Sequence, residues 1–231
     1  MTATLVVIPF RGSRGAKSRL GPLFSERQRA QLAWAMLRRT VRAAEASNAV
    51  DHVLIVTHEP EVVRLQLPMS AGVTVLPQGR DRIGLNGALE HGRDWAVAHG
   101  FGAMLVLPGD LPAIDDQEIA RLAGAAATVV IAPDRHRAGT NALLLRLGVE
   151  GGRRFAFAFG DDSYRRHTDE ARRLDMSPEH LNLRGVALDL DTPDDWQRLP
   201  IATREHLLAA LEDSPERSAP PAEQLVALKG A

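Results

Sequence analysis

The sequence predicts an α/β fold built on a mixed, mostly parallel sheet with flanking helices. Short apolar runs alternate along the chain with amphipathic stretches of helical periodicity, which is typical of βα units. The apolar runs are more crowded in the second half of the chain, and this spacing indicates some antiparallel pairing there. A length of 231 residues fits one large domain, or one domain with a short appendage.

The strands are predicted from apolar runs bounded by turn residues. In chain order they are Leu5–Ile8, Val53–Val56, Val73–Leu76, Ala103–Leu107, Val129–Ala132, Ala142–Leu145 and Val186–Leu188, with a further short apolar segment at Phe155–Phe159.

The helices are predicted from capping residues and from the spacing of apolar positions. Ser25 and Gln28 form a capping-box pattern at the start of a helix that runs to about Ala46. Thr192 and Pro193 likewise mark the start of a helix, with threonine as N-cap and proline in the first turn. The other helices are expected at about Leu85–Ala98, Asp115–Leu122, Asp162–Arg173 and Arg204–Leu211.

The C-terminal end differs in composition from the rest. Residues Ser214–Pro221 are rich in proline and serine, as in a linker. We therefore predict a single domain over residues 1–213 and a flexible or docking tail over residues 214–231.

Charge and composition exclude several classes of function. The net charge of −1 gives no global field that favours nucleic acid or an anionic membrane. No apolar run approaches the roughly 20 residues that span a bilayer, and the chain opens on a strand-like run without a leader pattern, so we expect a cytoplasmic protein. The absence of cysteine excludes disulfides, thiolate nucleophiles and iron–sulfur clusters.

The loop after the first strand is a candidate anion site, since ligands of open α/β sheets bind outside the carboxyl ends of the strands. Gly12 and Gly15 allow the backbone to approach a ligand, while Lys17 and Arg19 supply positive charge. Only two of the 28 basic residues are lysine, and Lys17 is the one within the predicted domain. A solvated basic loop is the alternative, but the position of the loop favours an anion site.

Acidic residues follow two other predicted strands. Asp110 comes just after one strand, and Asp189 and Asp191 follow another at a spacing that puts both carboxylates on one side of an extended chain. Each has a simpler explanation, as a turn residue or a helix cap. Together they predict a Mg²⁺ site, because Mg²⁺ binds carboxylates along with substrate phosphates.

A second anion pocket is predicted near the start of the Asp162–Arg173 helix. Thr140 enters a strand, and Gly160 and Ser163 stand where a helix N-terminus offers backbone N–H groups. Ser163 could instead be a plain N-cap, and His167 a polar surface residue rather than a ligand contact. Gly84 and Asn86 carry a weaker signal for a base or ribose pocket.

Five ordered motifs resemble the guanylyltransferases of deazaflavin coenzyme F-420 biosynthesis, which act on 2-phospho-L-lactate, phosphoenolpyruvate or 3-phosphoglycerate. The motifs are Ala16-Lys17-Ser18-Arg19-Leu20, Pro108-Gly109-Asp110-Leu111-Pro112, Gly139-Thr140-Asn141-Ala142-Leu143, Phe159-Gly160 with Ser163 and His167, and Asp189-x-Asp191-Thr192-Pro193-Asp194-Asp195. The resemblance covers about residues 5–199. It implies a Rossmann-like sheet of the nucleotide-diphospho-sugar-transferase type.

The resemblance also implies a reaction, in which GTP and a phosphorylated three-carbon acid give a guanylyl-diphospho acid and pyrophosphate. It implies that Asp110, Asp189 and Asp191 hold Mg²⁺. Thr140, Gly160 and Ser163, with His167 nearby, would bind the acceptor, and Lys17 with Arg19 would bind triphosphate and stabilise the transition state. Gly12, Gly15, Gly84 and Asn86 complete the expected nucleotide site. A downstream deazaflavin phosphotransferase would use the product, and a homodimer is left open.

Two alternatives stay open beside this interpretation. The chain could be another nucleotidyltransferase, or a nucleotide-sugar glycosyltransferase of the same fold. A non-catalytic scaffold is disfavoured, because three clustered carboxylates are costly without a cation. The sequence does not decide which phospho-acid is used. It also departs from the family at Pro9-Phe10-Arg11, where relatives often have Pro-x-Lys.

Overall fold

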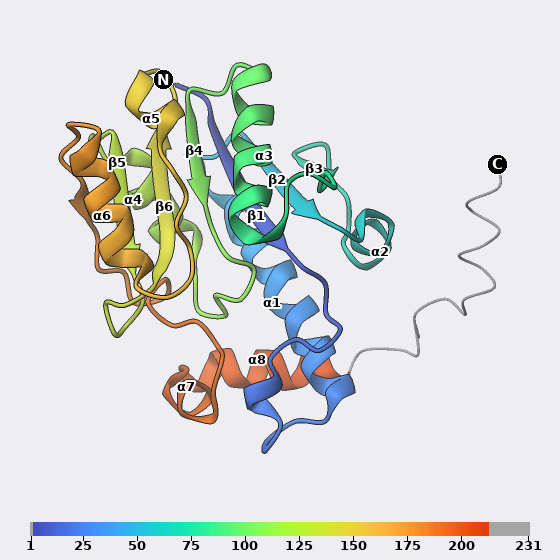
Figure 1. Ribbon diagram of the computed structural model, residues 1–231. Helices are drawn as coiled ribbons and strands as arrows, with labels where there is room; N and C mark the ends of the chain where they lie inside the picture. Colours follow the sequence, from blue (N-terminus) through green and yellow to red (C-terminus); the bar gives the residue numbers. More distant parts are fainter. Residues whose placement is uncertain (1, 213–231) are drawn as a thin grey trace, which may run out of the picture.

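A seven-stranded sheet with helices on both faces forms the framework of the protein (Figure 1). The computed structural model describes residues 2–212. The strands are β1 (Thr4–Phe10), β2 (His52–Thr57), β3 (Val73–Pro77), β4 (Ala103–Val106), β5 (Val129–Pro133), β6 (Thr140–Arg146) and β7 (Glu179–His180). Their order is β3-β2-β1-β4-β6-β5-β7, and within this described sheet β6 alone runs antiparallel to its neighbours. The predicted mixed, mostly parallel α/β fold is confirmed.

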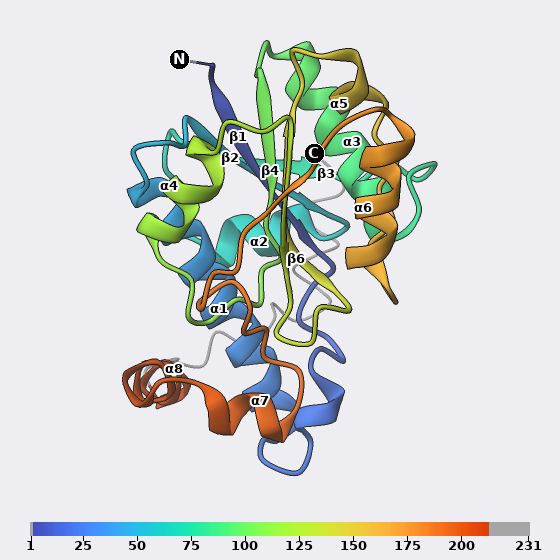
Figure 2. The same ribbon diagram turned by 90° about the vertical axis from the view of Figure 1, so that its left-hand side faces the viewer.

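Two helical layers cover the sheet (Figure 2). The helices are α1 (Glu26–Ala46), α2 (Pro60–Gln66), α3 (Gly84–Ala98), α4 (Asp116–Gly124), α5 (Glu150–Arg154), α6 (Ser163–Arg173), α7 (Pro193–Arg198) and α8 (Ile201–Glu212), with a 3-10 turn η1 (Ser18–Leu20). Because side chains alternate along a strand, Val6 and Ile8 of β1 pack with α1, α2 and α4. Leu5 and Val7 pack on the other face, with α3 and α6.

A third apolar group lies outside the sheet. Leu20 of η1, Met36 of α1 and Leu207 of α8 are fully buried together with Leu190, which precedes α7. Figure 1 shows α7 and α8 below the sheet, and α8 lies against α1. This packing ties the segment after β1 to the segment before α7, so two distant parts of the chain meet at one end of the sheet.

Both predicted helix starts are confirmed in atomic detail. The Ser25 hydroxyl accepts a hydrogen bond from the Gln28 amide, and the Gln28 side chain accepts one from the Ser25 amide. Thr192 and Asp195 form the same reciprocal pair at the start of α7, with Pro193 in the first turn. Each box satisfies two backbone donors that a helix start would otherwise leave unpaired.

The predicted strand at Val186–Leu188 is wrong. These residues lie in a turn and an irregular segment, and the edge of the sheet is formed by β7 instead. Val186 is fully buried among the residues that face α1 and α4, but its carbonyl accepts from the Asn141 side chain rather than from a strand. The apolar run therefore reflects burial and not strand pairing. Helices α2 and α5, like β7, were not anticipated.

The predicted tail at 214–231 lies outside the described residues. Within residues 2–212, no helix is both long enough and apolar enough to cross a membrane.

Candidate functional site

The strand order brings several predicted residues to one edge of the sheet. β1 and β4 are parallel neighbours, so the segments that follow them, with Lys17 and Asp110, leave the sheet on the same side. β6 runs the opposite way, and its first residue, Thr140, therefore lies at this same edge. The sheet topology thus brings segments that are far apart in sequence together at one edge of the sheet.

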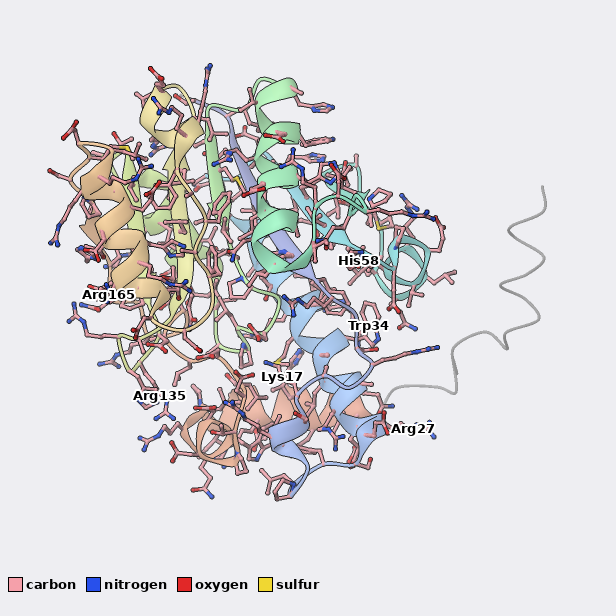
Figure 3. The ribbon with its side chains drawn as sticks, in the orientation of Figure 1. Lys17, Arg27, Trp34, His58, Arg135 and Arg165 are labelled. Carbon is pink, nitrogen blue, oxygen red and sulfur yellow. The ribbon has the colours of Figure 1, made fainter. Side chains whose placement is uncertain are left out.

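Lys17 lies between two of the predicted acidic residues. Its ammonium group is 2.6 Å from Asp110 Oδ2 and 2.6 Å from Asp191 Oδ1, and its side chain is only 9% exposed. Burial alone would lower the pKa of Lys17, but the charges of Asp110 and Asp191 outweigh it and raise the pKa above its ordinary value. Lys17 is therefore a permanent cation below the sheet (Figure 3).

The third acidic residue belongs to the same cluster. Burial, together with the charges of Asp110 and Asp191, raises the pKa of Asp189. The Asn141 side chain donates to Asp189 Oδ1 at 3.3 Å, and the Leu190 amide donates to the Asp110 carbonyl at 3.3 Å. These bonds join the two acidic segments to each other and to β6.

The cluster has the donor chemistry of a hard-cation site. Asp110 Oδ1 is buried and has no hydrogen-bond partner, and all of the available donors are oxygen atoms, as Mg²⁺ prefers. As they stand, no three acidic or histidine side chains of residues 2–212 are gathered closely enough to hold a metal ion. The ammonium of Lys17 is the cation that these carboxylates contact.

A cavity of about 240 Å³ adjoins the cluster. Lys17, Asp110, Arg11 and Gly12 are among the residues that line it, and Phe10, Met36 and Leu85 supply apolar surface. Gly12 has a φ of +100°, a backbone conformation that side-chain-bearing residues rarely adopt, so the loop favours glycine here. Gly15 also has a positive φ, while Arg19 is exposed beside the loop.

The second predicted pocket is organised around Thr140. The Thr140 amide donates to Ser163 Oγ at 2.9 Å, and Thr140 Oγ1 lies 2.9 Å from His167 Nδ1. Ser163 is the first residue of α6 rather than its N-cap, which is Asp162. The hydroxyl of Ser163 thus serves β6, so the simple capping explanation is wrong.

His167 is buried rather than on the surface, and both of its ring nitrogens are engaged. The Ala158 amide donates to Nε2 at 3.0 Å, so Nε2 carries no proton and Nδ1–H donates to Thr140 Oγ1. Burial, aided by the charge of Arg166, lowers the pKa of His167 to about 4. The ring is a neutral support for Thr140, and it leaves the Thr140 hydroxyl proton free to donate elsewhere.

Asn86 links the two halves of the site. Its amide nitrogen donates to the Phe159 carbonyl at 3.3 Å, and its amide oxygen accepts from the Phe159 N–H at 2.9 Å. The start of α3, including Gly84, is therefore tied to the segment that carries Gly160. Gly160 has a φ of +118° and is exposed, which leaves its backbone open to a ligand.

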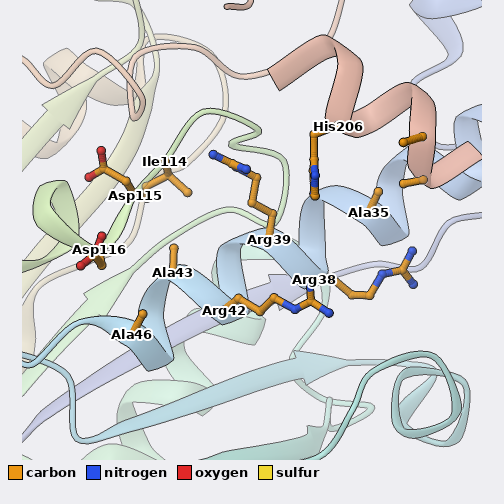
Figure 4. Close-up of a pocket in the computed structure, with 12 residues that line it drawn as sticks. Ala35, Arg38, Arg39, Arg42, Ala43, Ala46, Ile114, Asp115, Asp116 and His206 are labelled. Carbon is orange, nitrogen blue, oxygen red and sulfur yellow. The ribbon is translucent and has the colours of Figure 1, made fainter. Parts of the chain in front are cut away.

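A larger cavity, of about 600 Å³, lies elsewhere (Figure 4). It is formed by Arg38, Arg39 and Arg42 of α1 with Asp115, before α4, and His206 of α8. None of the predicted site residues lines it, so size alone does not identify the site.

Two supporting residues, Asn141 and Asp195, escaped the sequence analysis as individual candidates. The Asn141 side chain donates to Asp189, while Arg11, which stands where relatives often have lysine, lines the cavity next to Lys17. Asp195 accepts from the backbone amides of Asp191 and Thr192, which orients the acidic segment. The two motifs that contain Asn141 and Asp195 were a signal, but the contacts of these residues depend on the fold.

Comparison with known proteins identifies the family. The family described as guanylyl transferase CofC like matches residues 4–206. The chain belongs to this family. Phosphoenolpyruvate guanylyltransferase of Rubrobacter xylanophilus is 40% identical over 201 residues, which cover 85% of this chain and 93% of the relative. The 2-phospho-L-lactate guanylyltransferase of Methanothermobacter thermautotrophicus is 34% identical over 194 residues, covering 83% and 82%.

Solved structures agree on the fold. A nucleotidyl transferase from Methanothermobacter thermautotrophicus superposes with a TM-score of 0.62 at 18% identity, covering 90% of this chain and 98% of its own. A Mycobacterium tuberculosis protein, solved as a complex with manganese, has a TM-score of 0.53 at 20% identity and covers 86% and 98%. At these identities the likeness concerns the fold.

The neutral His167 predicts a pH dependence of stability. The unfolded chain takes up a proton on this histidine near pH 6.5, whereas the folded protein resists it down to about pH 4. The contribution of His167 to the free energy of unfolding is therefore complete above about pH 6.5. It is lost at about 1.4 kcal/mol per pH unit as the pH falls from about 6.5 to about 4. Urea unfolding of wild type and His167→Gln at several pH values measures this. We expect the difference in unfolding free energy to shrink as pH falls, whereas a constant difference would contradict a neutral His167.

Proposed function

We propose that the protein transfers GMP from GTP to the phosphate of a three-carbon acid and releases pyrophosphate, with Mg²⁺ as cofactor. The observation that carries the proposal is the convergence of Lys17, Asp110 and Asp191 beside a cavity at the carboxyl edge of the sheet. Family membership supports the guanylyl donor. The relatives cited above act on phosphoenolpyruvate and on 2-phospho-L-lactate.

Asp110, Asp189 and Asp191 are the proposed Mg²⁺ ligands. The partnerless Oδ1 of Asp110 favours an added cation, and so do the burial of Asp189 and the repulsion from Asp110 and Asp191, which together raise the pKa of Asp189. When bound, Mg²⁺ would neutralise the triphosphate and polarise its phosphoryl oxygens. Asn141 and Asp195 keep the acidic segment in position.

The proposed nucleotide site is the cavity beside Lys17. Gly12 and Gly15 expose backbone N–H groups to the phosphates, and Lys17 and Arg19 supply positive charge. The apolar wall of Phe10, Met36 and Leu85 suits a base or ribose surface. Asn86 and Gly84 connect this region to the acceptor side.

The proposed acceptor site is formed by Thr140, Gly160 and Ser163. Thr140 and Ser163 offer hydroxyl protons, and the exposed backbone of Gly160 suits an anionic group. His167 acts as a positioning residue, since both of its nitrogens are used inside the protein.

The chemistry then requires orientation more than covalent participation. A phosphate oxygen of the acid attacks the α-phosphorus of GTP and forms a new P–O bond. The bond from the α-phosphorus to the bridging oxygen breaks, and the electron pair leaves with pyrophosphate. Lys17 and Arg19 would stabilise the charge that develops on the phosphoryl oxygens. The resulting guanylyl-diphospho acid would suit a downstream deazaflavin phosphotransferase.

A direct assay tests the proposed function. Purified protein with GTP and Mg²⁺ is given phosphoenolpyruvate, 2-phospho-L-lactate or 3-phosphoglycerate, and pyrophosphate and product mass are measured. We expect Mg²⁺-dependent turnover with at least one acid, and phosphoenolpyruvate is the first to test. Release of pyrophosphate only with a sugar phosphate would instead favour a sugar nucleotidyltransferase.

Asp189→Asn is the matched test of the metal site in this assay. It keeps the size of the side chain but removes its charge, so turnover should fall by about 100-fold or more, beyond the usual effect of a residue outside the ligand set. Asp169→Asn, on the exposed side of α6, is the control and should leave turnover near wild type. Unchanged Mg²⁺-dependent turnover in Asp189→Asn would show that the assigned metal site is wrong.

Ser163→Ala tests the acceptor site separately. Loss of the hydroxyl removes a hydrogen bond to an anion and leaves the buried Thr140 amide without its partner. The KM for the acid should rise roughly 10–100-fold while the KM for GTP stays nearly constant. Steady-state kinetics with each substrate varied in turn decides this, and equal changes in both KM values would remove Ser163 from the acceptor site.

A further inference from the structure

Lys17 holds the position that a metal ion would need. Its ammonium contacts Asp110 Oδ2 and Asp191 Oδ1 at the same distance of 2.6 Å, and so bridges carboxylates from two separate segments. A second cation on these two oxygens would lie close to the ammonium, and the repulsion between the like charges would oppose its binding. An ion that takes Asp110 Oδ2 and Asp191 Oδ1 as its ligands therefore has to displace the ammonium.

The bridge leaves the cluster short of positive charge. One ammonium pairs with the two carboxylates of Asp110 and Asp191, and Asp110 Oδ1 remains buried without a hydrogen bond. A divalent ion would compensate this excess better than a single lysine does. The ammonium of Lys17 thus occupies the position between the carboxylates, and a cation of higher charge would neutralise them more completely.

The ammonium also has somewhere to go. Lys17 lines the cavity of about 240 Å³ that Arg11 and Gly12 share, so rotation of its four-carbon side chain can carry the charge into that space. The backbone at Lys17 is left-handed, with φ +55° and ψ +40°. Displacement of the ammonium requires rotation of the side chain only, and the backbone can keep this conformation. Phosphate groups in the cavity would offer the ammonium new partners.

We propose that Lys17 is an exchangeable counterion, which bridges Asp110 and Asp191 in the free protein and yields this position to a divalent cation when nucleotide phosphates enter the adjoining cavity. The inference rests on the proposed function for its ligands. The exchange makes metal binding and nucleotide binding depend on each other. The nucleotide phosphates offer the displaced ammonium new partners, and the metal ion replaces the ammonium between the carboxylates. By linkage, the nucleotide raises metal affinity by the factor by which the metal raises nucleotide affinity.

Binding of Mn²⁺ alone tests the exchange without catalysis. Free Mn²⁺ is measured by electron paramagnetic resonance in titrations of wild type, Lys17→Met and Arg14→Met, with no nucleotide present. Lys17→Met keeps the apolar stem and removes the competing charge, so its Mn²⁺ affinity should exceed that of wild type by about tenfold or more. Arg14→Met removes an exposed charge from the same loop and should bind Mn²⁺ within about twofold of wild type.

The titration repeated with a non-hydrolysable GTP analogue completes the test. Wild-type affinity for Mn²⁺ should rise with the analogue, and Lys17→Met should gain much less because its site is already free. Equal or weaker Mn²⁺ binding by folded Lys17→Met overturns the proposal. If that variant does not fold, an unchanged wild-type affinity with and without the analogue overturns it instead.

The turnover assay with GTP and a phospho-acid separates the proposed exchange of Lys17 from the proposed guanylyltransferase function. Wild-type turnover of GTP with a phospho-acid, combined with no gain in Mn²⁺ affinity for Lys17→Met, would remove the exchange and leave the proposed function intact. Absence of turnover with every acid would count against the function itself.

Discussion

The ion pairs of Lys17 with Asp110 and Asp191 are the contact on which the arrangement of the site depends. Three carboxylates meet where separate segments leave the sheet, and without a cation their repulsion would push these segments apart. The ammonium holds two of them at 2.6 Å. Removal of one carboxylate would leave the buried ammonium of Lys17 with less compensation, whereas exchange of one cation for another preserves the charge balance. The site between Asp110 and Asp191 is therefore suited to the exchange of the lysine ammonium for a metal ion.

The remainder of the site is held by neutral hydrogen bonds rather than by charge. Asn141 joins β6 to Asp189, Asn86 joins α3 to Phe159, and the uncharged His167 supports Thr140. Asn86 uses both ends of its amide and His167 both ring nitrogens on protein partners, and the Asn141 amide nitrogen donates to Val186 as well as to Asp189. Because satisfied buried polar groups are rigid, they provide a fixed frame around a charge cluster that can rearrange.

Much of the fold could be predicted because local patterns and tertiary structure agree. Ser25 and Thr192 cap helices as their sequences indicate, and apolar runs such as Val53–Val56 pair as strands. Val186 shows the limit, since a short apolar run reports burial without saying whether the backbone joins the sheet. The short β7, with half-buried Glu179 and His180, carries no apolar signal at all.

The candidate site was predictable in its location and less so in its contacts. Residues that follow strands gather at one edge, so Lys17, Asp110 and Asp191 could be expected near each other. That the lysine bridges the two carboxylates depends on side-chain direction and on the backbone conformation at Lys17, neither of which has a sequence pattern. Likewise, the spacing of Ser163 and His167 suggests a common face of a helix, but only the packing of α6 on β6 turns both toward Thr140.

A crystal structure with Mn²⁺ and the α,β-methylene analogue of GTP would test the central claim most directly, because anomalous scattering locates the metal. The account predicts a manganese peak bound by Asp110 and Asp191, with the Lys17 ammonium moved into the adjoining cavity against the phosphates. A manganese ion bound elsewhere, with Lys17 still between the two carboxylates, would contradict it.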